Sequence, residues 1–280
     1  MLANIQVVVN AAGPFSGTAP ALMHACLRNR SHYLDLSNEA CTFQLAWSLD
    51  STARQAGVAL VPGAGFGTVA AEDLAAHVLE RINGTDSLTI VRTSRGGATS
   101  PGVTATTLEL LARRGGGVRD GEWQELGRKT AVFELPGGRR AAVPVALGDA
   151  FAVAQATGVA NVASYAATRM HPQLARWAIP AARAALTAIK PWGGMLRCRP
   201  TAEPGLAGGG TLLWMRAANL SGGTATSILE AGNGTEITAV IALQCLQKLL
   251  RHPPQGVFTA GQLLSRPGPL SIPGMQITDL

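Results

Sequence analysis

The chain has 280 residues, of which 47% are hydrophobic and 14% are charged, and its formal net charge is +6. An average soluble domain carries roughly 25% charged residues, so this composition excludes a disordered chain, a coiled coil and a charge-rich scaffold. The 33 glycines follow no Gly-X-Y period, which excludes collagen. The basic residues are scattered and do not alternate with aromatic residues, so we expect no nucleic-acid partner and favour a small anionic ligand.

Strands and helices alternate over the first 82 residues. The pattern predicts strands at 5–10, 33–36 and 58–62, and helices at about 19–30, 39–56 and 68–82. Short β-branched runs are typical of buried parallel strands. The links between these elements are short, which favours βαβ units and a parallel sheet.

The pattern changes after residue 84. We expect a strand at 87–93, a loop at 94–102, a helix at 103–113 and several strands over 118–147. A helix at 150–157, capped by Asp149, and a helical region at 170–190 should follow. The rest should contain paired strands at 209–217 and 223–230, a helix at 236–251 capped by Thr235, and an extended segment with one short helix in the tail. We expect the glycine runs 115–117 and 208–210 to lie in loops. The fold class predicted is α/β: a partial doubly wound, Rossmann-like parallel sheet and a mixed α+β part.

Two glycine-rich segments follow predicted strands. Gly13-Pro14-Phe15 follows the first strand and Gly63-Ala64-Gly65-Phe66-Gly67 follows the third. Ligands of open parallel sheets bind outside the carboxyl ends of the strands. Glycine there lets backbone N–H groups approach a phosphate or a flat ring, although the same glycines could serve only to make tight turns. The two segments together favour a ligand crevice.

The four cysteines show no paired spacing, and no Cys/His cluster appears, so we expect a cytoplasmic protein without a metal site. No uncharged apolar run is long enough for an obvious membrane span. The region 170–192 sets Trp177 and Trp192 among basic and apolar residues, which is compatible with peripheral membrane contact or with packing on a sheet.

Several motifs carry a resemblance. Val7–Phe15, His32–Glu39 and Val61–Phe66 resemble consecutive motifs of the saccharopine dehydrogenase-like oxidoreductases, which include trans-acting enoyl reductases. Further resemblance lies in the segments 94–107, 148–162 and 256–259. The chain departs from the family pattern at Asn38, where Gly is usual, at Gly67, where an acid is usual, at Ala70, where Pro is usual, and at Ala260, where the terminal motif has Pro.

The resemblance implies an NADP(H)-dependent oxidoreductase, with NAD(H) not excluded, that reduces a carbonyl, imine or enoyl group. Family members begin with a strand and a Gly-rich phosphate loop that has no counterpart here, so we expect an N-terminally truncated domain with impaired cofactor binding. The expected parts are residues 1–84 as the C-terminal portion of a dinucleotide-binding domain, 85–234 as the substrate domain, and 235–280 as a helix and tail that return to the first domain. A non-catalytic remnant or interaction subunit and a membrane-surface lipid reductase remain alternatives.

The resemblance also implies site residues. The predicted cofactor-binding residues are Asn10, Gly13, Pro14, Phe15, Gly63, Gly65 and Phe66, and the predicted catalytic residues are Tyr33, Asp35, Glu39 and Arg95. A tyrosine or carboxylate at the second strand tip could relay a proton to the substrate, and Arg95 could hold a carboxylate or phosphate. The alternatives are a backbone cap for Asn10, caps of the helix beginning near residue 39 for Asp35 and Glu39, and a solvated surface position for Arg95. The substrate expected is a small molecule, with a lipid, a carboxylate and a homo-oligomeric assembly all left open.

Overall fold

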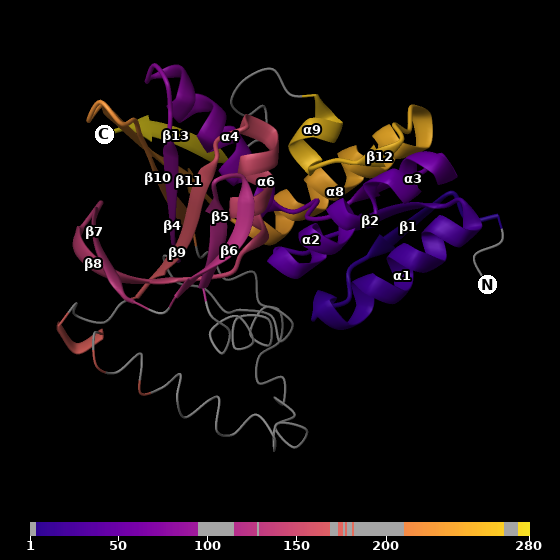
Figure 1. Cartoon of the computed structure of the whole chain (residues 1–280), viewed down its shortest axis with the longest axis horizontal. Helices are drawn as coiled ribbons and strands as arrows, with labels where there is room; N and C mark the ends of the chain where they lie inside the picture. The colour runs from indigo at the N-terminus through magenta and orange to yellow at the C-terminus, as the bar shows by residue number, and fades with distance from the viewer. Residues whose placement is uncertain are drawn as a thin grey trace.

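The computed structural model describes residues 4–94, 115–127, 129–168, 173–175, 177, 181, 210–265 and 274–280. These residues form two sheets that lie side by side (Figure 1). One sheet has four parallel strands and the other is a mixed sheet of nine strands. The predicted α/β fold class is therefore confirmed. Among the described helices, none has both the length and the apolar character needed to cross a bilayer.

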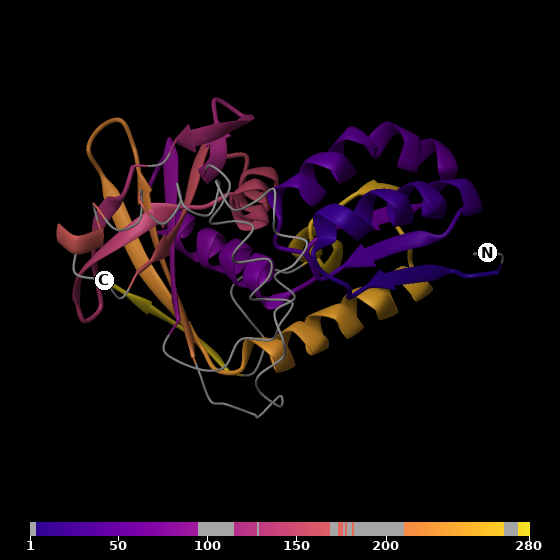
Figure 2. The ribbon, with the colours of Figure 1, turned by 90° about the horizontal axis from the view of Figure 1, so that it is seen from below.

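The parallel sheet has the strand order β1–β2–β3–β12. Its strands are β1 (Val7–Asn10), β2 (His32–Asp35), β3 (Ala59–Val61) and β12 (Gly256–Val257). Helices α1 (Phe15–Asn29), α2 (Ala40–Ser48) and α3 (Asp50–Ala56) cover one face, and α8 (Gly234–Arg251) lies along the other (Figure 2). Because the strands are parallel, the segments that follow β1, β2 and β3 meet at one edge.

The prediction of one helix over 39–56 was wrong, because two helices occupy this segment. At Leu49 the backbone leaves the helical conformation, with φ −100° and ψ 4°. Asp50 then begins α3 and accepts hydrogen bonds from Arg54 Nε at 2.8 Å and from the backbone N–H of Val257 at 2.8 Å. The break therefore places a carboxylate where it ties α3 to β12.

The mixed sheet has the order β13–β11–β10–β4–β9–β5–β6, and β8 pairs with both β9 and β7. Its strands are β4 (Ser87–Ser94), β5 (Gly115–Arg119), β6 (Glu122–Gly127), β7 (Ala131–Leu135), β8 (Gly138–Pro144), β9 (Asn161–Ala167), β10 (Thr211–Ala218), β11 (Thr224–Ala231) and β13 (Met275–Asp279). Strands β10 and β11 pair, as predicted, and they run antiparallel. Strands β9 and β13 are additional to those expected from the sequence.

The glycines at 115–117 form part of β5, so the prediction of a loop there was wrong. A Cβ atom built on Gly116 would lie 2.2 Å from the Trp123 ring, and one on Gly117 would lie 2.6 Å from the carbonyl oxygen of Val162. These glycines allow β5 to pass closely between its neighbours, which a larger residue would prevent.

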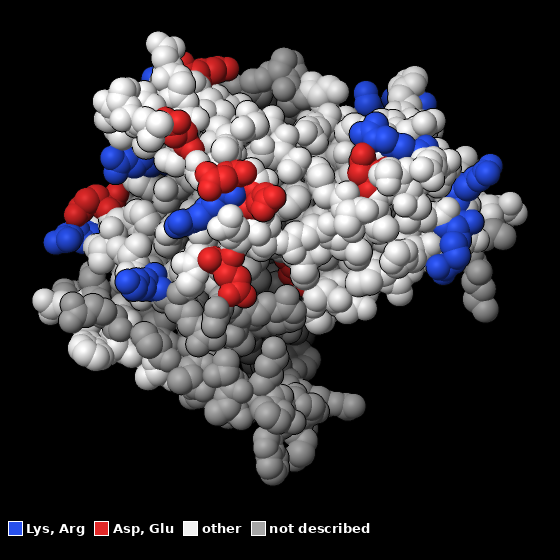
Figure 3. Space-filling model, viewed as in Figure 1, with Lys and Arg blue, Asp and Glu red and all other residues white. Residues whose placement is uncertain are grey.

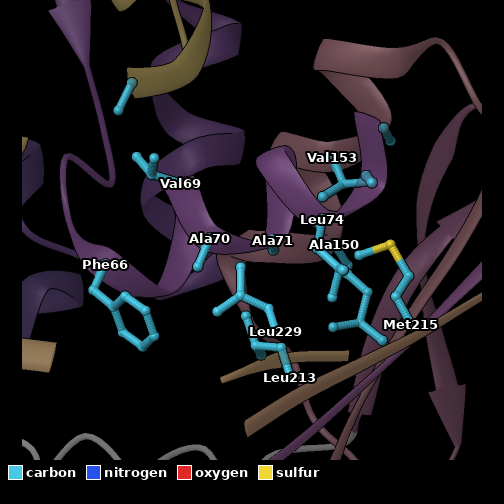
Figure 4. Packing of buried hydrophobic residues seen from close by; sticks show 14 of the residues in the cluster. Phe66, Val69, Ala70, Ala71, Leu74, Ala150, Val153, Leu213, Met215 and Leu229 are labelled. Atoms are coloured by element: carbon cyan, nitrogen blue, oxygen red, sulfur yellow. The ribbon is translucent and has the colours of Figure 1, made fainter. Parts of the chain in front are cut away.

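Two helices pack between the sheets and fill the core. Helix α4 (Phe66–Glu80) follows β3, and α6 (Gly148–Thr157) precedes β9. Figure 4 shows apolar side chains of both helices facing strands β10 and β11, and one buried cluster contains them together with residues of β2 and β3. The labelled members are Phe66, Val69, Ala70, Ala71, Leu74, Ala150, Val153, Leu213, Met215 and Leu229. This shared core fixes the first turns of α4 and α6 relative to both sheets.

Candidate functional site

An exposed loop follows β1 at the carboxyl edge of the parallel sheet. Residues 11–14 are exposed, and the Gly13–Pro14 peptide bond is cis. Asn10, which is 3% exposed, supports this loop because its Oδ1 accepts the Ala12 N–H at 3.1 Å. Asn10 thus makes a backbone contact of the kind that the capping interpretation predicts, and Gly13 and Pro14 lie where a ligand in solution can reach them.

A buried chain of hydrogen bonds connects this loop to the neighbouring strand tips. Asn10 Nδ2 donates to Tyr33 OH at 3.2 Å, and Tyr33 OH donates to Asp35 Oδ2 at 2.9 Å. Asp35 Oδ1 accepts the backbone N–H of Gly63 at 2.8 Å and that of Ser37 at 2.9 Å. These hydrogen bonds therefore link the segments that follow β1, β2 and β3.

Tyr33 and Asp35 are both 0% exposed. Burial raises the pKa of Asp35 to about 6, although the N–H donors of Gly63 and Ser37 act in the opposite direction. Burial, and then the nearby Asp35 charge, raise the pKa of Tyr33 well above its usual range. The pair can hold a proton near neutral pH, but in this conformation neither group touches solvent, and their contacts position the loops.

The side chain of Glu39, which follows β2, lies at the N-terminus of α1. Its carboxylate is buried, at 3% exposure, and accepts the backbone N–H of Phe15 at 2.8 Å and that of Ser16 at 2.9 Å. Glu39 stands at the N-cap position of α2, but its side chain makes no cap hydrogen bond to that helix. The positive end of the α1 dipole, where an anion would bind, is therefore already neutralised by a carboxylate of the chain itself.

The segment after β3 is a buried turn. Gly63 has φ +75°, and a Cβ there would lie 2.2 Å from the Phe43 ring, so this glycine is required by backbone conformation and packing. At Gly65 the nearest atom to a Cβ is 3.6 Å away, which is ordinary contact. Phe66 is 6% exposed and belongs to the core, while its N–H donates to Thr238 Oγ1 at 3.0 Å. Gly63, Gly65 and Phe66 are all buried, so they shape the turn at the carboxyl edge of the sheet and do not present a surface to a ligand as residues 11–14 do.

The structure also brings forward two residues that the sequence did not single out as site residues, Arg92 and Asn38. Arg92 of β4 donates through Nη2 to the Gly67 carbonyl at 3.1 Å and to Asp149 Oδ2 at 2.8 Å. The N–H of Asp149 donates to Asn38 Oδ1 at 3.0 Å. These contacts join the mixed sheet to the carboxyl edge of the parallel sheet.

Asp149 is therefore not the N-cap of α6 that the sequence predicted. Leu147 holds that position, and the fully buried Asp149 carboxylate accepts the Ala150 N–H at 2.7 Å and pairs with Arg92. Thr235 is also not a cap: Asn233 caps α8 by accepting the Thr235 N–H at 3.1 Å. A sequence signal for the Arg92 region existed, since Asn38 and Gly67 are two of the departures from the family pattern.

The other predicted residues and surfaces are placed as follows. Arg95 and Trp192 lie outside the described residues, and Trp177 is 73% exposed. Within the described ranges, no group of three or more His, Cys, Asp or Glu side chains could hold a metal ion. On the face drawn in Figure 3, charged side chains stand in small scattered groups, several of which contain both basic and acidic residues.

Comparison with models of protein families and with curated proteins found no match. Among solved structures, the chain is similar to saccharopine dehydrogenase (L-Glu forming) from Saccharomyces cerevisiae, with a TM-score of 0.54 and 10% identity over 93% of this chain and 80% of that one. Amine dehydrogenase from Mycobacterium smegmatis matches with a TM-score of 0.44 and 11% identity over 92% of this chain and 75% of that one. The first likeness shows that the chain shares its fold with that saccharopine dehydrogenase.

Proposed function

We propose that the chain is a nicotinamide-dependent oxidoreductase that reduces a carbonyl, imine or enoyl group, with NADP(H) as the expected cofactor and NAD(H) as the alternative. One observation carries the proposal: in a fold shared with a dehydrogenase over 93% of the chain, an exposed loop lies at the tip of β1. Ligands of such sheets bind outside the carboxyl ends of the strands. When bound, the cofactor would supply the hydride.

The residues at this edge would divide the work of holding the cofactor. Gly13 and Pro14 would border the nicotinamide and its ribose, because they are exposed and Gly13 has no side chain. Asn10 would hold the loop in place through its bond to the Ala12 N–H. The N-terminus of α1 does not fit a cofactor phosphate, because the Glu39 carboxylate fills it.

The buried pair would then act indirectly. Tyr33 and Asp35 are sealed from solvent, so we assign them the positioning of the three strand tips and not direct contact with the substrate. Proton delivery from Asp35 through Tyr33 would require the loop at residues 11–14 to move.

The experiment that tests the proposal is a fluorescence titration of the purified chain with NADPH and, separately, with NADH. The proposal predicts saturable binding of at least one of them. The absence of binding of either nucleotide would contradict it.

A second candidate is a non-catalytic interaction subunit. It is favoured by the 0% exposure of both Tyr33 and Asp35, which leaves the proposed proton chain without access to a substrate. This candidate predicts that the same titration detects no binding of either nucleotide, so the titration distinguishes the interaction subunit from the oxidoreductase.

A further inference from the structure

The side chains of Arg92 and Asn38 each bring an N–H donor close to Gly67, where the two sheets meet, and the described contacts give these donors no acceptor. Arginine carries five N–H donors, and the described contacts of Arg92 use only Nη2. Its Nε is buried and has no hydrogen-bond partner among the residues that the structure describes. Asn38 accepts the Asp149 N–H through Oδ1, and the described contacts give its Nδ2 no acceptor. We infer that Arg92 Nη1 and Asn38 Nδ2 bind a carboxylate group beside Gly67.

The geometry brings both donors to the same stretch of bare backbone. A Cβ atom built on Gly67 would lie 2.9 Å from Asn38 Nδ2, and 3.0 Å and 3.3 Å from Arg92 Nη1 and Nη2. Any side chain at this position would therefore push the two groups aside. Gly67 is partly exposed, whereas Phe66 and Thr68 on either side are buried, so a solute can approach at this residue.

The charges and donor geometry suit a carboxylate. The buried Asp149 carboxylate balances the Arg92 charge and holds the guanidinium by Nη2, which leaves Nη1 to face a second acceptor. Two donors from different side chains can each take one oxygen of a carboxylate, and the bond to the guanidinium is charge-assisted. The same two groups offer no partner to the third oxygen of a phosphate.

The site lies at the edge where we propose the nicotinamide. Asn38 follows β2, and Gly67 follows the turn after β3. If the proposed function holds, the carboxylate belongs to the substrate, and this assignment alone rests on that function. The anion site itself is independent of it and can be tested without a cofactor.

The test is thermal unfolding of the chain in sodium acetate, with sodium chloride at equal ionic strength as the reference. A ligand that binds only the folded state raises Tm in a saturable way, and we expect acetate to do so for the wild type. Gly67→Ala places a methyl group 2.9–3.3 Å from the two donors, which must shift to admit it, so the acetate effect should be lost relative to the Tm of the same variant in chloride. Arg92→Gln should also lose the effect. The control Arg139→Gln removes an arginine that is 71% exposed and should keep it.

Three results would overturn the inference. The first is a wild-type Tm that does not respond to acetate, and the second is an equal acetate response in wild type and Gly67→Ala. The third is a response to inorganic phosphate, but not acetate, that depends on Gly67, which would show that the ligand class is wrong. If Arg92→Gln does not fold, the Gly67→Ala comparison decides. An acetate response in a chain that binds neither NADPH nor NADH would refute the proposed function and leave the anion site standing.

Discussion

The Glu39 carboxylate is the side chain whose role the structure defines most sharply, and Glu39→Gln tests that role. The substitution keeps the size of the side chain and removes its charge. In the wild type, the two carboxylate oxygens accept the N–H groups of Phe15 and Ser16 at 2.8 and 2.9 Å in a site that is 3% exposed. A glutamine can offer one carbonyl oxygen, so one N–H of α1 would face an NH₂ donor instead of an acceptor.

The expected loss follows from these contacts. A hydrogen bond to a charged group contributes about 1.5–3 kcal/mol, and an N-cap substitution costs about 1 kcal/mol. The loss is partly offset, because the Glu39 charge also raises the pKa of Asp35 and its removal relieves that repulsion. We expect a net destabilisation of about 2 kcal/mol, which lowers Tm by roughly 4–8 °C for a chain of this size.

The assay is urea unfolding at pH 7.5, with thermal unfolding as a second measurement. The matched control is Glu134→Gln, because Glu134 is 76% exposed and its ion pair with Arg139 lies on the surface. Surface pairs contribute about 0–1 kcal/mol, so the control should stay close to wild type. Equal stabilities of Glu39→Gln and Glu134→Gln would refute the reasoning and would return Glu39 to the list of candidate proton carriers.

Two further predictions concern the same edge of the sheet. Gly63→Ala should lower the free energy of unfolding by more than about 2 kcal/mol, because φ is +75° and the new methyl group would overlap Phe43. The control Gly17→Ala should not destabilise the chain, since nothing lies within 4 Å of a Cβ there. Equal urea midpoints for the two variants would contradict this prediction. The folded state binds the Asp35 proton more tightly than the unfolded state, since burial raises its pKa from 3.8 to about 6, so its contribution to stability is present below pH 4 and is lost as the pH rises through 6. The stability of wild type relative to Asp35→Asn should therefore fall between pH 4 and 7 in a series of urea titrations, and parallel pH profiles would show that the Asp35 pKa is not raised.

Local sequence patterns predicted the parallel sheet well. The β-branched run at Val7–Val9 and the alternation of short apolar strands with helices are properties of the segments themselves. Strand β5 was missed because its three glycines have no strand propensity, and their extended conformation follows from close contacts with Trp123 and Val162. Such contacts come from β6 and β9, so they exist only once the sheet has formed.

In the candidate site, too, some features could be predicted from the sequence and others depend on tertiary contacts. The glycine-rich segments after β1 and β3 could be assigned to one edge, because parallel strands place their carboxyl ends together. The pairing of Arg92 with Asp149 could not be predicted, because it joins residues 57 positions apart through the packing of α4 against α6. From sequence, Asp149 before a helix is typical of an N-cap, and only the tertiary structure shows a buried ion pair in its place.

If the proposed function is right, a nicotinamide cofactor binds at the exposed loop after β1. Gly13→Glu tests it most directly, because Gly13 is exposed and its φ is not in the left-handed region that favours glycine. The added carboxylate would occupy the proposed cofactor position and repel its phosphates. Ser51→Glu adds the same charge at an exposed position of α3, away from the strand tips, and serves as the control. In a fluorescence titration with the nucleotide that wild type binds, NADPH or NADH, we predict saturable binding by wild type and Ser51→Glu and a loss of about tenfold or more in affinity for Gly13→Glu. Equal binding by all three, or binding of neither nucleotide by wild type, would contradict the proposal.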